Sequence, residues 1–187
     1  MIDDYKDNKE MVLGELNDAL NHIKSEDVDK LIDYLLKADK IFLIGVGRVL
    51  ISLNAIAKRW AHLGIDVHLV GEITEPAITK NDLLIVGSGS GSSLIPVAIA
   101  KKAKDVGATV IHIGSNSKGT MSNYADFMLR IPVQTKLYFE DEIKSEQPMT
   151  SLFEQSLFVL GDIVSVMIIK RQNLDLKNLW QHHANLE

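Results

Sequence analysis

The sequence predicts an α/β fold, a three-layer α/β/α sandwich built on a five-stranded parallel sheet. Short aliphatic segments such as KIFLIGV and LLIVG alternate with longer stretches of helical periodicity. Strands that are separated by about one helix each form βαβ units, in which the strands are parallel. Strands that are apolar throughout are typical of a sheet covered by helices on both faces.

Length and composition indicate one domain of 187 residues, and 46% hydrophobic residues supply its core. The net charge of -5 argues against nucleic acid or an anionic membrane as the main partner. The chain has no cysteine, which excludes thiolate chemistry and agrees with a cytoplasmic protein. The charged start MIDDYKDNKE is unlike a signal peptide. The longest apolar run, 157–169, is interrupted by Gly161 and Asp162, so we expect no membrane span.

Residues 1–38 are expected to form a helical arm that packs on the main domain or on a partner. Apolar residues recur at helical spacing in residues 3–24. A second amphipathic stretch follows, and Ser25 is its expected N-cap.

The sheet core is expected within residues 40–132, and a C-terminal helix and tail within residues 149–187. The expected strands are 40–46, 66–70, 83–86, 108–113 and 126–131. The expected helices are 48–63, 94–106 and 149–171. Residues 133–150 are polar and are expected to form a loop that could act as a lid.

The loop after the third strand, GSGSGSS at residues 87–93, consists only of glycine and serine. Glycines let the backbone approach a ligand closely, and the following helix offers its first N–H groups to an anion. We interpret Ser88, Ser90 and Ser93 as phosphate ligands, with Ser92 as a helper. The alternative, a flexible linker, fits poorly because the loop lies between an apolar strand and a helix.

Two other small-residue loops, at residues 45–48 and 114–117, also follow strands. In a parallel sheet the carboxyl ends of the strands meet at one edge, where ligands bind. The three loops together therefore predict a ligand site at that edge, and Arg48 could pair there with a phosphate or a sugar hydroxyl.

Other phosphate-loop chemistries fit the sequence less well. A dinucleotide fingerprint at residues 45–50, with Glu72 as the ribose-binding acid, has Leu50 at its third glycine position. No Gly-Lys-Ser/Thr closes the 87–93 loop as in a nucleotide-binding P-loop. A serine nucleophile in a G-x-S-x-G elbow is only loosely matched.

Glu154 in SLFEQ lies among apolar residues on the last long helix and is a candidate for moving a proton on carbon. His182 and His183 in the tail are candidates for proton transfer near neutral pH. The alternative interpretations are a solvent-facing glutamate on the helix and two surface histidines near the end of the chain. The adjacent histidines are a poor metal pair, and no metal site is expected.

The motifs GVGR, AKRWAHLG, VGE, LLIVGSGSGSS, SLFEQ and HHANLE together resemble the 6-phospho-3-hexuloisomerase family of the sugar isomerase (SIS) domain group. The resemblance implies a flavodoxin-like sheet and a homotetramer with active sites between subunits. It implies interconversion of D-arabino-3-hexulose 6-phosphate and D-fructose 6-phosphate, the second step of formaldehyde fixation in the ribulose monophosphate pathway. It implies a small-molecule sugar phosphate as ligand and no cofactor.

The resemblance also implies roles for particular residues. Ser88, Ser90 and Ser93 match the phosphate loop, Glu154 matches the base of an enediolate mechanism, and His182 or His183 matches its acid/base helper. Further substrate-binding residues are expected at Gly47, Arg48, Gly89 and Ser92.

The sequence departs from the family pattern at three positions. Val49 and Leu50 replace Ser and Gly in the first loop, and Ser92 replaces a Glu in the second. Two alternative functions therefore stay open: another SIS aldose–ketose isomerase, or a noncatalytic sugar-phosphate-binding regulator.

Overall fold

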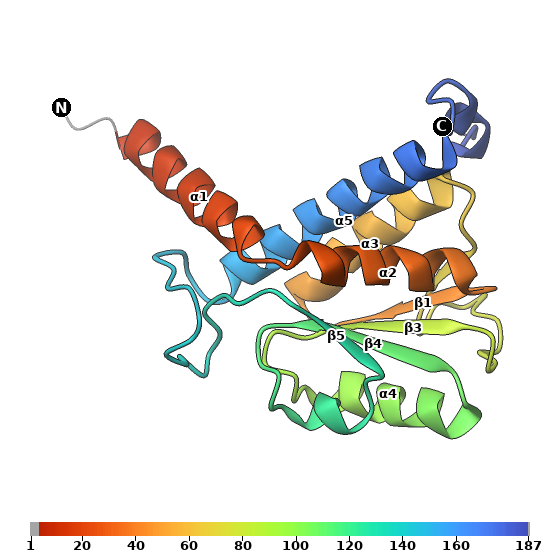
Figure 1. Cartoon of the computed structure of the whole chain (residues 1–187), viewed down its shortest axis with the longest axis horizontal. Coiled ribbons are helices and arrows are strands. Elements are labelled where there is room, and N and C mark those ends of the chain that lie inside the picture. Colours follow the sequence, from red (N-terminus) through yellow and green to blue (C-terminus); the bar gives the residue numbers. More distant parts are fainter. Residues whose placement is uncertain (1–3, 187) are drawn as a thin grey trace.

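The computed structural model describes residues 4–186, and it confirms the α/β/α sandwich with a five-stranded, all-parallel sheet (Figure 1). The strand order is β2-β1-β3-β4-β5. The strands are β1 (Ile41–Ile44), β2 (Val67–Leu69), β3 (Leu83–Gly87), β4 (Thr109–Gly114) and β5 (Phe127–Arg130). Each lies within two residues of its predicted bounds. The order of strands reverses between β1 and β3, so the ligand site of this fold is expected where these two strands end.

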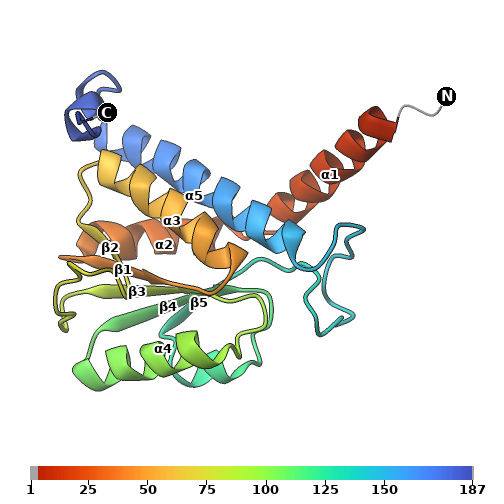
Figure 2. The same cartoon turned by 180° about the vertical axis from the view of Figure 1, so that it is seen from behind.

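Helices cover both faces of the sheet (Figure 2). One face carries α2 (Ser25–Lys37), α3 (Arg48–His62) and α5 (Ser151–Gln172), and the other carries α4 (Leu94–Val106) and the 3₁₀ helix η1 (Thr120–Asn123). Successive residues of a strand point to opposite faces. Thus Leu43 packs in the core under α3 and α5, whereas Phe42 packs in the core under α4. This two-sided burial explains why the strands are apolar throughout.

The expected helical arm divides into two parts. Helix α2 belongs to the body, because Leu31, Ile32 and Leu35 are buried in the core. Helix α1 (Asp4–Asn21) projects from the body, with only Ala19 near its C-terminal end buried (Figures 1 and 2). The prediction of Ser25 as N-cap is wrong: Ser25 is already helical, and the capping position is Lys24, which makes no side-chain cap bond.

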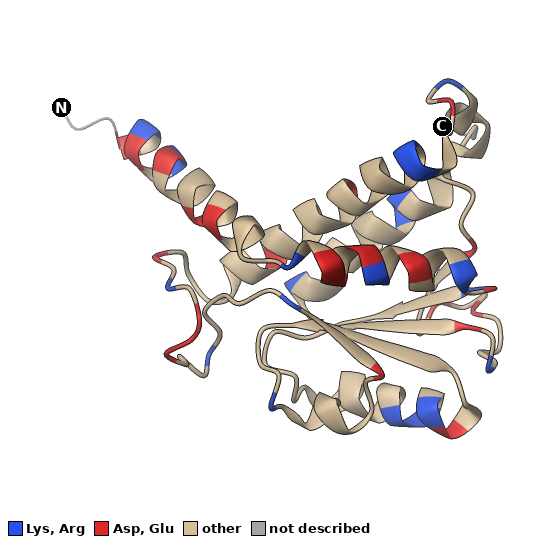
Figure 3. Ribbon diagram, in the orientation of Figure 1, with Lys and Arg blue, Asp and Glu red and all other residues tan. Residues whose placement is uncertain are grey.

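Charged side chains are interspersed on the outer helices rather than separated by sign. Figure 3 shows Lys and Arg alternating with Asp and Glu along α1 and α2, while the strands are uncharged over most of their length. Most charges thus lie outside the layers that form the core, and the buried carboxylates Asp82, Glu142 and Glu154 are exceptions.

Helix α5 is long and apolar enough to cross a membrane, with a mean hydropathy of 1.8, which the interrupted run 157–169 did not lead us to expect. However, 56% of the most apolar window is buried inside the fold. Its buried residues, which include Phe153, Leu157 and Val164, belong to the main core. We therefore interpret α5 as the core helix of a soluble domain.

Helices α3 and α5 run side by side in the same direction and approach closely at Gly161. Arg48 at the start of α3 pairs with Glu154 at the start of α5, and Arg59 lies 3.8 Å from Asp162 further along. A Cβ atom at position 161 would lie 2.4 Å from Ile56 Cγ1. Such a distance is too short for a side chain, so only glycine lets the two helices come this close.

Gly161→Ala is therefore expected to destabilise the protein by about 1–3 kcal/mol through overpacking, despite the better helix propensity of alanine. Urea unfolding measures the change. In an Ile56→Ala background the same substitution should cost much less, because the opposing side chain is gone. An equal cost in both backgrounds would show that the contact with Ile56 is not the cause.

Candidate active site

The three small-residue loops meet at the carboxyl edge of the sheet, as the sequence predicts. The second loop packs against the start of α3, which directly follows the first loop, because a Cβ on Gly87 would lie only 2.8 Å from Val49 Cγ1. The third loop holds the second: the N–H groups of Ser115 and Asn116 both donate to the Gly89 carbonyl, at 3.1 and 3.0 Å. Loops that follow β1, β3 and β4 thus form one continuous surface at the switch in strand order.

The 87–93 loop is a compact turn that brings the predicted serines together. The Oγ atoms of Ser88 and Ser93 lie 3.4 Å apart, and the Gly91 N–H donates to Ser88 Oγ at 3.2 Å. Gly91 has φ +63°, a conformation that favours glycine. Ser93 is the residue directly before α4, so the loop leads into a helix N-terminus, which attracts anions.

Ser90 and Ser92 occupy the outer part of the same loop. Ser90 is half-buried, and its Oγ accepts a weak bond from the Ser92 N–H at 3.4 Å. Ser92 is exposed, and its Oγ accepts from the Thr120 N–H at 3.2 Å. Ser92 therefore ties the loop to η1, in addition to any contact with a ligand.

Glu154 lies in the first turn of α5, and its carboxylate is almost fully buried, with two side chains that hold it and a third that binds its backbone carbonyl. Arg48 donates to Oε2 through Nε, and Thr150 donates to Oε1 through its hydroxyl at 2.9 Å. The Ser52 hydroxyl donates to the Glu154 carbonyl at 3.0 Å. The Arg48 charge offsets the cost of burying the carboxylate.

A groove of about 370 Å³ opens beside this carboxylate, between the N-terminal halves of α3 and α5. Its lining residues are Arg48, Ile51, Ser52, Ala55, Glu154, Gln155 and Phe158. The glycine–serine loop reaches the start of α5 from the sheet side, because a Cβ on Gly89 would lie 3.6 Å from Phe153 Cγ. The same end of the molecule, near the starts of α3 and α5, thus holds the predicted phosphate loop, Arg48 and Glu154.

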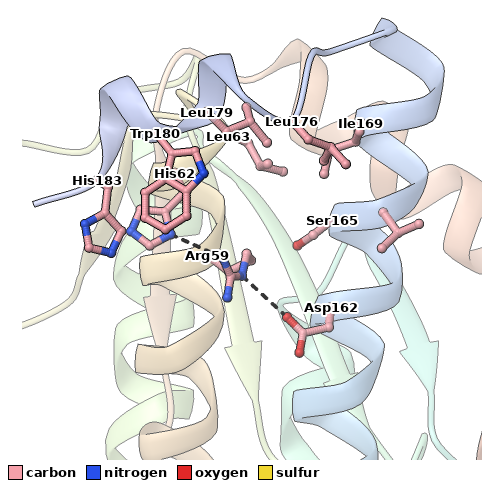
Figure 4. A pocket seen from close by; sticks show the side chains of 11 residues that line it. Arg59, His62, Leu63, Asp162, Ser165, Ile169, Leu176, Leu179, Trp180 and His183 are labelled. Carbon is pink, nitrogen blue, oxygen red and sulfur yellow. Dashed lines mark hydrogen bonds and ion pairs between the residues drawn. The ribbon is translucent and has the colours of Figure 1, made fainter.

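The tail lies at the other end of α3 and α5, where Figures 1 and 2 show the C-terminus beside the last turns of both helices and Figure 4 shows His183 beside His62. The ring of His183 stacks on His62 at 5.1 Å between centroids, and Trp180 lies 5.2 Å away. His62 is 14 residues beyond Arg48 on α3, which corresponds to about 21 Å along the helix. One chain therefore brings together the serines, Arg48 and Glu154 but keeps His182 and His183 apart from them.

A cavity of about 400 Å³ separates this tail from the body. Figure 4 shows Arg59, Asp162 and Ser165 on one side of the cavity and the apolar side chains of Leu176, Leu179 and Trp180 on the other. Its lining is mostly apolar, and two of its residues, Leu176 and Trp180, are well exposed. The tail thus presents an apolar surface beside the histidines.

The loop expected at residues 133–150 is anchored on the site by a residue that the sequence did not single out. Glu142 is buried and accepts from the Ser115 hydroxyl at 3.1 Å, from the Thr135 hydroxyl at 3.0 Å and from the Thr135 N–H at 3.1 Å. A Cβ on Gly89 would lie 3.4 Å from Thr135 Cγ2. Glu142 thus fixes this loop against the carboxyl edge of the sheet.

His112 on β4 is a second residue that the sequence analysis missed. Its ring is buried beneath the glycine–serine loop, and Nε2 lies 2.8 Å from the Ser88 carbonyl oxygen. Burial lowers the pKa of His112, although the bond to the Ser88 carbonyl opposes this shift. The folded protein therefore favours the neutral ring.

This shift predicts a loss of stability in mild acid. The unfolded chain takes up a proton at His112 near pH 6.5, whereas the folded chain does so only at lower pH. The contribution of His112 to the free energy of unfolding is therefore fully present above pH 6.5 and decreases as the pH falls below it. The slope from this one group is at most about 1.4 kcal/mol per pH unit. Urea unfolding of wild type and His112→Gln at pH 7.5 and 5.5 measures it. The wild type should lose more stability over this interval, and parallel losses would contradict the prediction.

Metal-binding clusters are not found in the described part of the chain. Within residues 4–186 no group of three or more His, Asp or Glu side chains is placed to hold a metal ion.

Comparison with known proteins gives the same fold and a consistent set of relatives. The SIS domain family model matches residues 34–163. A 3-hexulose-6-phosphate isomerase of Bacillus subtilis strain 168 is 36% identical over 176 residues, which cover 94% of this chain and 95% of the relative. The protein of the same name from Mycobacterium gastri is 35% identical over 185 residues, covering 99% and 92%.

Among solved structures, a protein from Methanococcus jannaschii has a TM-score of 0.83 and 33% identity. The similarity covers 97% of this chain and 99% of that one. Its crystal structure is described as inferring a molecular function of 3-hexulose-6-phosphate isomerase.

The sheet order, the glycine–serine loop at the strand switch and the family match define a sugar isomerase domain, and the chain belongs to the SIS domain family. Within that family it is similar over nearly its full length to relatives named 3-hexulose-6-phosphate isomerase, which confirms the predicted resemblance.

Proposed function

We propose that this protein is a phosphosugar isomerase that interconverts D-arabino-3-hexulose 6-phosphate and D-fructose 6-phosphate. The observation that carries the proposal is the placement of a buried carboxylate, Glu154, at the same sheet edge as the 87–93 loop. An isomerase of this kind needs a base at the sugar carbons and a separate handle for the phosphate. The names of the full-length relatives support this choice of substrate.

The reaction moves the carbonyl group from C3 to C2 without net oxidation. The base removes the proton from C2, and the electron pair forms a C2=C3 enediolate. Return of a proton to C3 and transfer of the hydroxyl proton from O2 to O3 leave the carbonyl at C2. The atoms and electrons balance within the sugar, so the proposed reaction needs no cofactor.

In this proposal Glu154 is the base, and Thr150 and Arg48 hold its carboxylate in place. Ser88, Ser90 and Ser93 bind the phosphate with the N-terminus of α4, and Gly47, Gly89 and Ser92 complete the substrate contacts. Hydrogen bonds to a phosphate are charge-assisted and stabilise the complex by about 1.5–3 kcal/mol each. Binding energy at this distant handle fixes the sugar carbons against the base.

We further propose that the active site is shared between subunits. The groove beside Glu154 is open, and the outer faces of α3 and α5 expose Ile51, Phe158 and Val166. Because α3 and α5 run in the same direction, a two-fold axis across them would place the tail of one copy over the groove of the other. The partner's His182 or His183 would then supply the acid/base helper that one chain keeps away from Glu154.

Burial of this apolar face supports association into a homotetramer, in which two such pairs combine. The proposed setting is the cytoplasm, because the substrate is a phosphorylated metabolic intermediate. In this setting the enzyme performs the second step of formaldehyde fixation.

A coupled assay tests the proposed reaction. 3-Hexulose 6-phosphate is formed in situ from formaldehyde and ribulose 5-phosphate by a synthase, and fructose 6-phosphate is followed with phosphoglucose isomerase and an NADP-linked dehydrogenase. We expect turnover that depends on this protein. Binding of fructose 6-phosphate without turnover would instead indicate a sugar-phosphate-binding regulator.

A further inference from the structure

Four successive carbonyl groups of the 87–93 loop are held from behind by β4 and the segment that follows it. The Ser88 carbonyl faces His112 Nε2 at 2.8 Å, and the Gly89 carbonyl accepts from the N–H groups of Ser115 and Asn116. The Ser90 carbonyl accepts from Asn116 Nδ2 at 3.0 Å, and the Gly91 carbonyl accepts from the Met121 N–H at 2.8 Å. Each of these oxygens is therefore kept away from an anion that binds on the opposite side.

Fixing a carbonyl also fixes the N–H group of the next residue. A trans peptide is planar, and its N–H points opposite to its C=O. The bonds to the Ser88 and Gly89 carbonyls thus aim the N–H groups of Gly89 and Ser90 away from β4. Within residues 4–186 neither of these two N–H groups has a hydrogen-bond acceptor. They are available to a ligand in a buried or half-buried loop.

Two of the bonds behind the loop come from side chains, and both are well placed for the task. Burial lowers the pKa of His112 and so favours the neutral ring, whose single proton must be on Nε2 to donate to the Ser88 carbonyl. Asn116 is buried, and its Oδ1 accepts from the Lys118 N–H at 2.9 Å. That bond fixes the orientation of the amide, so Nδ2 points to the Ser90 carbonyl.

The segment that follows β4 packs closely against the back of the glycine–serine loop at Gly119. A Cβ on Gly119 would lie 2.7 Å from the carbonyl oxygens of both Ser90 and Gly91. Any other residue at this position would push the loop away from its support.

We propose that His112 and Asn116 are positioning residues that hold the glycine–serine loop in its phosphate-binding form. They do not touch the ligand. His112 keeps the Ser88 carbonyl behind the loop and so the Gly89 N–H in front. The Asn116 side chain keeps the Ser90 carbonyl behind the loop, and the Asn116 N–H holds the Gly89 carbonyl, so that the Ser90 N–H points to the front. The inference rests on the proposed function only in taking a phosphate group as the ligand, and it concerns binding rather than turnover.

Isothermal titration calorimetry with inorganic phosphate and with fructose 6-phosphate tests the proposal without requiring turnover. For His112→Leu and Asn116→Ala we expect the Kd of each ligand to rise about tenfold, which corresponds to about 1.4 kcal/mol. His112→Gln retains an N–H donor and should restore most of the affinity. In steady-state kinetics KM should rise with Kd, while kcat should change by less than about twofold, because a fixed phosphate handle serves binding.

Val110→Ala is the matched control. Val110 is buried on β4 on the same face as His112, so its truncation destabilises the core without removing a bond to the loop. Its Kd should equal that of the wild type. The proposal is overturned if His112→Leu binds as tightly as wild type, if Val110→Ala weakens binding equally, or if His112→Gln is no better than His112→Leu.

The binding data also separate this proposal from the proposed reaction. Weakened phosphate binding in a protein that shows no turnover would support the positioning residues and reject the isomerase. Turnover by the wild type, together with unchanged phosphate affinity in the variants, would support the isomerase and reject the positioning roles of His112 and Asn116. A wild-type protein that binds neither ligand would contradict the phosphate-binding loop itself.

Discussion

Glu154→Gln is expected to lower kcat by about 10³-fold or more while leaving the Kd for fructose 6-phosphate within about twofold of wild type, since general-base catalysis contributes about 10²–10⁴-fold. The amide has the shape of the carboxylate and can still accept from the Thr150 hydroxyl. Arg48 is well exposed and can turn to water when its partner loses the charge. The coupled assay gives kcat, and calorimetry gives Kd.

Asp105→Asn provides the control for this carboxylate-to-amide change. Asp105 is exposed near the C-terminal end of α4, on the opposite side of the sheet from α5. Its variant should match the wild type in both kcat and Kd. A kcat for Glu154→Gln within about tenfold of wild type would remove Glu154 from the role of base.

The fold could be predicted because its signals are local. Each strand is an aliphatic run that ends in small residues, and each crossover helix ends near a glycine such as Gly64 or Gly107, both of which have positive φ. The loop at residues 87–93 was found for the same reason, since strand, glycine–serine turn and helix are contiguous. The start of α2 was misplaced because Ser25 satisfies the composition of an N-cap but not its geometry.

The support of the site could not be predicted, because it joins residues far apart in the chain. Arg48 and Glu154 are separated by 106 positions, and nothing in either local sequence indicates their ion pair. His112 is the one ionisable residue in the strand TVIHIG, and the sequence does not indicate what its ring contacts. Glu142 follows two other acidic residues and resembles a solvated charge run, yet it is buried. Only the tertiary arrangement distinguishes these residues from their neighbours.

Two of the three departures from the family pattern, Val49 and Ser92, make contacts between loops in the structure. Val49 packs against Gly87, so its apolar side chain joins the first loop to the second. Ser92 binds η1 through its hydroxyl, a bond that a longer Glu side chain at this position would make differently. Both residues therefore shape the loops of the proposed phosphate site, and neither contacts Glu154, the proposed base, in these interactions.

The proposal of a shared active site makes a prediction that a self-contained site does not: two inactive variants should restore activity when their subunits mix. One variant is Glu154→Gln with an intact tail, and the other is the double substitution His182→Ala and His183→Ala. The double substitution keeps Trp180, which lines the cavity under the tail. With random pairing of equal amounts, about one quarter of the sites combine an intact Glu154 with a partner's intact tail.

Co-expression of the two variants with different affinity tags, followed by two successive purifications, isolates the mixed oligomers for the coupled assay. Each variant expressed alone should be inactive, and the mixed oligomers should recover a substantial fraction of wild-type kcat. A mixture of Glu154→Gln with Glu154→Ala is the matched control and should stay inactive. No recovery in mixed oligomers, with both parent variants folded, would place the helper and the base in the same chain or remove the histidines from the reaction. In one chain the stacked rings of His62 and His183 lie near the far end of α3, so recovery is the outcome that the helix geometry favours.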